Sequence, residues 1–323
     1  MSATNPTSIP KEMQAAAIDR FGGPEVLHVE TLPVPQPKDT EVLIKLRTAG
    51  IGVWDPYVRE GELSSGSSTF PQVIGNDGAG EVVAVGPKVQ RFRVGDPVYA
   101  FAMEGGFYAQ YVAVKEAQVA PLPSGLELEQ AGALGADGIT ALRGLDDTLR
   151  LRADESLLIF GASGGIGHLA VQLAKRMGAR VFAVASGSDG VALARKLGAD
   201  EAMDGKTEEV AKGSRQKFPN GFDAALVLTS APNLAGALTT IKPGGRLAYP
   251  NGVEPVPRAP DGVTAKAYDG TPDPDAFKRL NALISRGPFQ VQLSHLYRLD
   301  EVAQAHRDLD KHHLGKLAIE VRA

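Results

Sequence analysis

The chain contains no cysteine among its 323 residues. This absence excludes disulfide bonds, thiol catalysis and zinc sites built on cysteine. The sequence also lacks both a block of basic residues and the run of about 20 apolar residues that a membrane-spanning helix needs. Because the formal net charge is −4, we expect no nucleic-acid partner and no membrane partner.

The N-terminal segment MSATNPTSIPKEMQ has no apolar core of the kind found in a signal peptide. We therefore expect a soluble, cytoplasmic protein. The six histidines are scattered along the chain. The adjacent pair His312-His313 would point about 100° apart on a helix, which is a poor arrangement for two metal ligands. The sequence predicts no metal site.

The composition, with 43% hydrophobic and 22% charged residues, is typical of a globular protein. The length suits about two domains. Up to about residue 125, short apolar runs alternate with Gly and Pro turns, which indicates an antiparallel or barrel-like β domain. Later, apolar strands alternate with helices, and this order predicts a parallel sheet covered on both faces. We expect strands at 157–160, 180–186, 222–229 and 245–250, and a helix at 233–245.

The strongest motif is LLIFGASGGIGHLAVQLAK, in which a buried strand runs into a glycine loop and then a helix. Gly164 lets the backbone approach a pyrophosphate, and Gly167 lets the helix and strand pack closely. Free N–H groups at the helix start bind the anion. A glycine-rich turn without a ligand is the alternative, but the strand before and the helix after favour a dinucleotide site. The predicted contacts are Ala162, Ser163, Gly164, Gly165, Ile166 and Gly167.

The residues after the next strand decide between the two nicotinamide cofactors. An Asp or Glu there would hold the ribose 2′-hydroxyl of NAD, whereas this chain has Ser186, Gly187 and Ser188. Their hydroxyl and N–H groups can bind a 2′-phosphate. Asp189 lies close and weakens this argument, while Arg195 offers positive charge. The sequence predicts NADPH in preference to NADH.

With the glycine loop in mid-chain, nearly the whole chain resembles the medium-chain dehydrogenase/reductase superfamily, most closely its zinc-free quinone oxidoreductases (zeta-crystallin-like). The segments GNDGAGEVVAVG, VGDPVYAF, GGFYAQY, the glycine loop and AHRDLDKHHLGKLAIEV follow in family order. The resemblance implies an α/β fold with two domains and the substrate in the cleft between them. A Rossmann domain with a doubly wound parallel sheet would span 126–265, and a GroES-like β-barrel catalytic domain would span 1–125 and 266–323.

Zinc alcohol dehydrogenases of this superfamily carry Cys in the loop 48–52 and His-Glu at the positions of Asn76 and Asp77. Gly52 offers no ligand here, and Asp77 alone cannot hold a catalytic zinc ion, which needs three protein ligands. We expect Asn76 and Asp77 to close a turn and pack beneath the cleft, with substrate contact by Asn76 as the alternative. The resemblance then implies zinc-free hydride transfer to quinones or α,β-unsaturated carbonyls, in which the developing charge delocalises.

The resemblance places the substrate and nicotinamide cleft at residues 51–61. Gly52 stands where the family often has Asn near the nicotinamide. Trp54 and Tyr57 offer aromatic walls, and the Tyr57 hydroxyl could donate a hydrogen bond or a proton; packing of the loop is the alternative for both. Asp55 matches a family acid, for which we expect a structural role, and Phe101 and Tyr108 would complete the pocket. On the cofactor side the implied contacts are Thr140, Leu228, Thr229, Ser230, Tyr249, Asn251 and Gly252.

Two positions depart from the family's quinone reductases, which often have Lys at the position of Gly190 and Tyr at that of Gly205. Both of those side chains help to grip the 2′-phosphate, so Lys206 or Arg195 would have to substitute for them. The leading hypothesis is an NADPH-dependent quinone or enone reductase. The alternatives are a metal-free dehydrogenase or reductase of other carbonyls, and an NADPH-binding redox sensor or structural protein with little turnover. The segment 263–269 reads as an edge strand that would pair with its twin in a homodimer.

Overall fold

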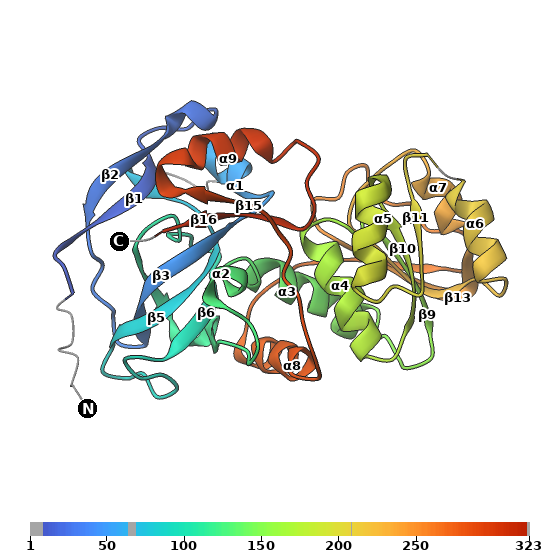
Figure 1. Cartoon of the computed structure of the whole chain (residues 1–323), viewed down its shortest axis with the longest axis horizontal. Helices are drawn as coiled ribbons and strands as arrows, with labels where there is room; N and C mark the ends of the chain where they lie inside the picture. Colours follow the sequence, from blue (N-terminus) through green and yellow to red (C-terminus); the bar gives the residue numbers. More distant parts are fainter. Residues whose placement is uncertain (1–8, 64–68, 208, 322–323) are drawn as a thin grey trace.

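The computed structural model of the chain describes residues 9–63, 69–207 and 209–321. They form two bodies that lie side by side along the long axis (Figure 1). One is rich in β-strands and contains the first and last described segments, and the other is an α/β body built from the middle of the sequence. None of the described helices is both long and apolar enough to cross a membrane.

The β-rich body contains a seven-stranded sheet and a three-stranded sheet. The long strand β3 (Glu41–Ile51) is central, because it pairs with β5, β7 and the C-terminal strand β16. The last strand of the chain therefore returns to the first domain, as the sequence predicts. The other strands of this body are β1 (Glu12–Ile18), β2 (Leu27–Pro33), β4 (Gln72–Val73), β5 (Asp77–Val85), β6 (Pro97–Phe101), β7 (Tyr111–Lys115), β8 (Val119–Pro121), β15 (Leu293–Arg298) and β16 (Lys316–Glu320).

The α/β body contains a six-stranded parallel sheet with the strand order β11-β10-β9-β12-β13-β14. The order reverses at β9, so the carboxyl ends of β9, β10 and β12 meet at a topological switch point, where such sheets bind ligands. This sheet confirms the predicted Rossmann architecture. Its strands are β9 (Ser156–Phe160), β10 (Arg180–Ala185), β11 (Glu201–Asp204), β12 (Phe222–Val227), β13 (Ile241–Pro250) and β14 (Thr264–Tyr268).

Helices cover the faces of the parallel sheet and fill the junction between the two bodies (Figure 1). The helix predicted at 233–245 is shorter than expected, because Pro243 and the left-handed Gly244 (φ 80°) cannot continue it and β13 already begins at Ile241. The helices are α1 (Asp55–Glu60), α2 (Leu128–Ala131), α3 (Gly135–Leu142), α4 (Gly165–Arg176), α5 (Gly187–Lys196), α6 (Val210–Lys217), α7 (Leu234–Leu238), α8 (Pro274–Ile284) and α9 (Val302–Asp308).

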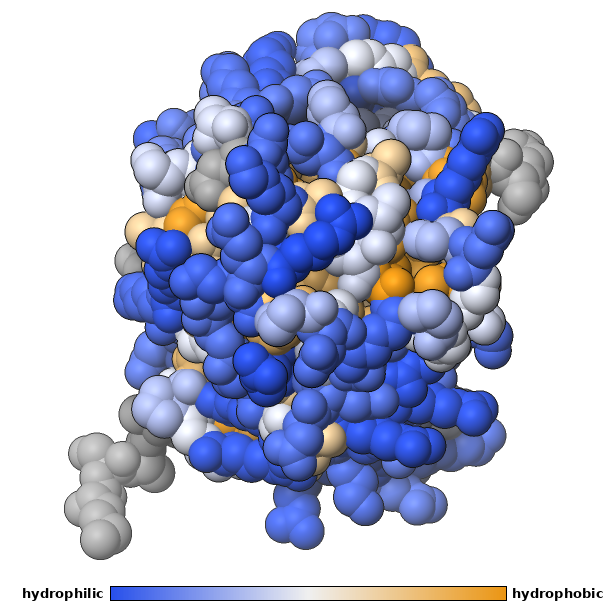
Figure 2. Space-filling view, turned by 90° about the vertical axis from the view of Figure 1, so that its right-hand side faces the viewer, coloured by the Kyte–Doolittle hydropathy of each residue, from blue (hydrophilic) through white to orange (hydrophobic). Residues whose placement is uncertain are grey.

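The outer end of the α/β body shows a mostly hydrophilic surface with small hydrophobic areas (Figure 2). The helices of this body thus turn their apolar faces towards the sheet. The predicted domain boundary at 265/266 falls inside β14, whose register with β13 continues to Tyr268. We propose that the Rossmann domain ends after Tyr268.

A polar stripe on α4 fixes the cofactor helix to the chain that returns to the catalytic domain. His168, Gln172 and Arg176 are spaced by four residues and therefore share one face of the helix. The N–H of Gln292 donates to His168 Nε2 at 3.0 Å, and Gln172 hydrogen-bonds both backbone groups of Gln290, at 2.8 and 2.9 Å. Arg176 donates to the carbonyl groups at the end of α8. The two domains are thus joined along the length of α4.

Candidate active site

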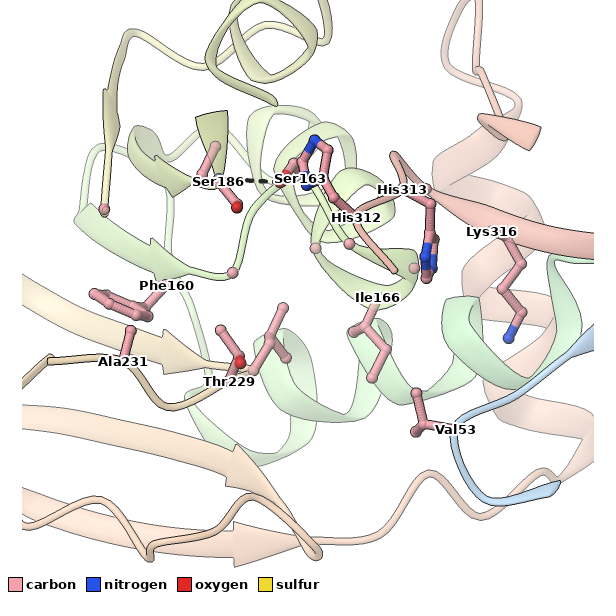
Figure 3. Close-up of a pocket in the computed structure, with 18 of the residues that line it drawn as sticks. Val53, Phe160, Ser163, Ile166, Ser186, Thr229, Ala231, His312, His313 and Lys316 are labelled. Atoms are coloured by element: carbon pink, nitrogen blue, oxygen red, sulfur yellow. Dashed lines mark hydrogen bonds between the residues drawn. The ribbon is translucent and has the colours of Figure 1, made fainter. Parts of the chain in front are cut away.

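A cavity of about 470 Å³ lies between the two domains, at the switch point of the parallel sheet (Figure 3). One wall is the glycine loop with the carboxyl ends of β9, β10 and β12. The facing wall comes from the catalytic domain: Ile51 and Val53 at one end, and the segment 309–316 along the side. A ligand in this cavity would contact both domains.

The glycine loop has the geometry that the sequence predicts. β9 ends at Phe160, Gly161 adopts a left-handed conformation (φ 94°), and α4 begins at Gly165. A Cβ atom on Gly167 would lie 2.1 Å from the Gly161 carbonyl oxygen, so only glycine allows this close packing. A Cβ on Gly164 would meet nothing closer than 3.7 Å, so the backbone there is open to the cavity. The N–H groups of the first turn of α4 are without helical partners and suit an anion.

The predicted cofactor residues divide into two groups in the structure. The first group lines the cavity: Ser163, Gly164, Gly165, Ile166, Gly167, Ser186, Leu228, Thr229 and Ser230. The second group lies outside this lining: Thr140, Ala162, Gly187, Ser188, Tyr249, Asn251 and Gly252. Their contact with cofactor stays a prediction.

Local contacts account for several members of the second group. Ala162 is fully buried in the loop. The Thr140 hydroxyl donates to the Ala136 carbonyl at 2.7 Å. Asn251 donates to Asp269 at 2.7 Å. These side chains have structural partners in the free protein.

The segment 309–313, which we call the strap, supplies lining residues that the sequence analysis did not single out as site residues. It connects α9 to Gly315, whose N–H donates to the Ser163 carbonyl in the glycine loop at 2.8 Å. Lys316 follows at the start of β16 and also lines the cavity (Figure 3). In the sequence, this segment was marked by its histidine pair and by its place in the family-like run AHRDLDKHHLGKLAIEV.

Lys316 is the cation of a buried charged cluster beneath the glycine loop. Its Nζ lies 3.1 Å from Asp137 Oδ1, and its side chain is 5% exposed. Burial opposes its charge, but Asp137, Asp77 and Asp55 together raise the pKa of Lys316 above its usual range. Gly165 makes room for this pair, because a Cβ there would lie 2.1 Å from Asp137 Oδ2. The cluster places the Lys316–Asp137 ion pair at the start of α4.

Asn76 and Asp77 lie at the start of β5, beside the cluster. The Asn76 amide donates to the carbonyls of Ala102 and Met103, at 3.1 and 3.3 Å. Asp77 accepts a hydrogen bond from the Ala136 N–H at 3.0 Å and is 2% exposed. Neither residue lines the cavity. These contacts fit the expected packing role beneath the cleft.

Replacing Asp77 by Asn should stabilise the protein at neutral pH. Burial raises the pKa of Asp77 to about 6, against the opposing effect of Lys316. An acid whose pKa is higher in the folded state than in the unfolded state stabilises the fold at low pH. This contribution is complete below the unfolded-state pKa of about 4 and is lost as the pH rises through the folded-state pKa of about 6. The Asn side chain keeps an oxygen that can accept from the Ala136 N–H, and it carries no charge that burial would penalise. We expect the free energy of unfolding of Asp77→Asn to exceed that of the unchanged protein by about 2 kcal/mol at pH 7.5.

Urea unfolding at pH 4 and 7.5 measures this effect. The advantage of Asp77→Asn should vanish at pH 4, where the aspartate is protonated in the folded state. Asp19→Asn is the control, because the Asp19 side chain is 54% exposed. An advantage for Asp77→Asn that is equal at both pH values would contradict the buried-charge explanation.

The loop before α1 carries the predicted catalytic residues. Val53 lines the cavity, whereas Gly52, Trp54 and Tyr57 lie outside its lining. The rings of Trp54 and Tyr57 are 5.4 Å apart, and both side chains are more than 40% exposed. The Trp54 indole also packs against Gly252 of the Rossmann domain, where a Cβ would lie 2.4 Å from the indole. The two aromatic residues therefore stand at the junction of the domains.

A chain of buried hydrogen bonds fixes the position of this loop. Asp55 Oδ2 accepts from the Gly52 N–H at 2.7 Å and from the Tyr108 hydroxyl at 2.6 Å. Arg59 donates to His306 Nδ1 at 2.8 Å, which leaves the proton on Nε2, 3.3 Å from the Tyr108 oxygen. Burial and Arg59 lower the pKa of His306 to about 3, so the ring stays neutral. This chain fits a structural role for Asp55.

The predicted pocket residues Phe101 and Tyr108 lie elsewhere. Both are buried in the core of the molecule and neither lines the cavity. Tyr108 faces Asp55 because its hydroxyl needs a hydrogen-bond partner once the ring is buried. The prediction that the two aromatic residues complete the pocket was therefore wrong.

Two family models match the chain. A zinc-binding dehydrogenase model matches residues 165–254, and an alcohol dehydrogenase GroES-like domain model matches residues 38–124. The quinone oxidoreductase of Mus musculus is 31% identical over 93% of this chain and 94% of its own length. An NADPH-dependent alkenal/one oxidoreductase of Arabidopsis thaliana is 33% identical over 99% of this chain and 82% of its own length.

Solved structures agree with these relatives. An NAD-dependent alcohol dehydrogenase is 29% identical, with a TM-score of 0.86 over 96% of this chain and 100% of the other. A mycobacterial protein solved in complex with NADPH is 26% identical, with a TM-score of 0.81 over 95% of this chain and 99% of the other. The similarity extends over both domains. The chain belongs to the medium-chain dehydrogenase/reductase superfamily, in its quinone oxidoreductase-like group.

Proposed function

We propose that this protein is a zinc-independent, NADPH-dependent reductase that transfers hydride to quinones or α,β-unsaturated carbonyls. The cavity between the domains carries this proposal, because it runs from the glycine loop to Ile51 and Val53 of the catalytic domain. A dinucleotide along the loop would present its nicotinamide at that end. The names of the relatives from mouse and Arabidopsis support the reaction class.

The residues present fit NADPH. Bound NADPH supplies the hydride. The start of α4 favours the negative charge of a pyrophosphate, and the Lys316 ammonium lines the cavity beside it as a hydrogen-bond donor. Ile166 and Val53 form apolar walls at the far end of the cavity (Figure 3). These side chains would give the acceptor apolar contacts beside the nicotinamide.

The proposed absence of zinc rests on the donor set. Gly52 has no side chain, the Asn76 amide is engaged with backbone carbonyls, and Asp77 is buried away from the cavity. Within the described part of the chain, no three or more His, Cys, Asp or Glu side chains are placed to hold a metal ion. A conjugated acceptor suits such a site, because its developing negative charge is delocalised and needs only hydrogen bonds.

The proposed proton source is Tyr57 or water. Tyr57 lies on α1 beside Trp54, with its side chain 44% exposed. We expect Tyr57→Phe to lower kcat if the hydroxyl delivers the proton. A variant that keeps the full kcat at every pH would assign the step to water.

Initial rates of NADPH oxidation by chelator-treated protein test the proposed function. The acceptors are 1,4-benzoquinone, 9,10-phenanthrenequinone and a small enone, each repeated with NADH. We expect saturable turnover that survives the chelator. Turnover with simple ketones or aldehydes alone would favour a reductase of other carbonyls. Tight nucleotide binding without turnover would favour a redox sensor.

We also propose a homodimer formed through β14. This strand is the last of the parallel sheet and pairs only with β13 among the described strands. Four of its five residues are exposed. An edge of this kind is protected when it pairs with a second copy. Sedimentation equilibrium should give twice the mass of one chain.

A further inference from the structure

The strap brings a histidine of the catalytic domain to the Rossmann domain. His312 Nε2 lies 3.0 Å from Asp189 Oδ2 and 3.2 Å from Asp189 Oδ1. Asp189 belongs to the first turn of α5, directly after Ser186 at the end of β10. Figure 3 shows the His312 ring at the same end of the cavity as Ser163 and Ser186. A dinucleotide on the glycine loop would place its adenosine ribose there.

At this end of the cavity, two glycine positions leave no room for a larger side chain. A Cβ on Gly190 would lie 2.9 Å from Ser163 Oγ, and a Cβ on Gly205 would lie 2.7 Å from Val184 Cγ1. A cation that meets a 2′-phosphate would therefore come from Lys206, beside Gly205, or from another element. The strap is the element of the catalytic domain that reaches this point.

Carboxylates already stand where a 2′-phosphate would bind. Asp204 Oδ1 accepts from the Gly187 N–H at 3.1 Å and from the Lys206 N–H at 2.9 Å. Asp189 Oδ1 accepts from the Gly190 N–H at 2.8 Å. Hydrogen bonds and nearby positive groups lower the pKa of both acids, so both are ionised near neutrality. A phosphate entering here meets two negative charges.

Other charged groups also lie around the cavity. Lys206 after β11 lines it, and the Lys206 N–H donates to Asp204 Oδ1 at 2.9 Å. Lys311 of the strap pairs with Asp308 of α9 at 2.6 Å. His312 is the strap residue that contacts Asp189 directly.

We propose that His312 favours NADPH over NADH by holding the Asp189 carboxylate. The imidazole lies 3.0 Å from Asp189 Oδ2 and keeps this carboxylate from facing a 2′-phosphate. Without the imidazole, the Asp189 carboxylate would repel that phosphate. NADH has no 2′-phosphate, so its binding does not depend on this contact. The proposal rests on the proposed use of NADPH.

Dissociation constants of NADPH and NADH test this, measured by nucleotide fluorescence on the full chain. We expect His312→Ala to lower the ratio of NADPH affinity to NADH affinity about 5-fold or more, because the Asp189 carboxylate then faces the phosphate without its partner. His295→Ala, on β15, is the matched control and should keep the ratio of the unchanged protein.

The double variant His312→Ala/Asp189→Asn provides a second test. With the carboxylate removed as well, NADPH should again bind about as tightly as it binds the unchanged protein. An unchanged affinity ratio in His312→Ala would overturn this proposal and leave the proposed function intact. Failure of the unchanged protein to bind either nucleotide would overturn both.

Discussion

Replacing Gly164 by valine should abolish NADPH binding and leave the protein folded. A Cβ at Gly164 would lie 3.7 Å from the nearest atom, the Gly161 carbonyl oxygen, so the free protein accommodates it. The φ angle of −81° and ψ angle of −175° are extended backbone that valine adopts readily. The valine methyl groups would fill the open face where the backbone approaches a pyrophosphate. We expect affinity for NADPH to fall about 100-fold or more, the scale of losing several charge-assisted hydrogen bonds.

Gly167→Val is the contrasting variant in the same loop. Its Cβ would lie 2.1 Å from the Gly161 carbonyl oxygen and 2.8 Å from Ala162 Cα, so the backbone itself must move. We expect this variant to unfold at lower temperature than the unchanged protein. Gly164→Val should keep the original melting temperature. Thermal unfolding and an NADPH titration on both variants separate the two effects. Normal NADPH binding by Gly164→Val would show that the pyrophosphate does not lie on this loop.

The features predicted from the sequence are those encoded within a short segment. The loop from Phe160 to Gly167 combines a buried strand, a left-handed glycine and a helix start, and each has a local signal. The alternation of strands and helices likewise predicts the parallel sheet. The predicted helix at 233–245 was too long because apolar spacing alone does not show that Ile241 pairs with Phe222 in the sheet.

The facing wall of the site depends on contacts that are distant in the sequence. His312 reaches Asp189 across 123 positions. The bond between His168 and Gln292 likewise spans 124 positions. The sequence around each of these residues contains no pattern that indicates its partner. Tyr108 was misplaced for a related reason: aromatic residues suit a pocket wall and a core equally, and its buried partner Asp55 is 53 positions away.

Lys316→Met should cause the largest loss of stability, because it removes the cation from a buried cluster of acids. Lys316 is 5% exposed, and Asp137, Asp77 and Asp55 all act on its charge. Breaking a buried ion pair from one side leaves an uncompensated charge, which costs about 3–5 kcal/mol. The free energy of unfolding should fall by that amount at pH 7.5. The loss should shrink at pH 5, where the raised pKa of Asp77, about 6 in the unchanged protein, lets it protonate.

The double variant Lys316→Met/Asp137→Asn separates the structural role of Lys316 from its role toward the cofactor. Removing the carboxylate 3.1 Å from the lysine should restore a large part of the lost stability. It cannot restore the ammonium donor beside the start of α4, so NADPH should still bind about 10-fold more weakly. Lys316→Arg is the conservative comparison and should keep most of the affinity. A double variant that regained both stability and affinity would make Lys316 a structural counter-ion only. The anion site would then consist of the glycine loop and the helix start without a cation.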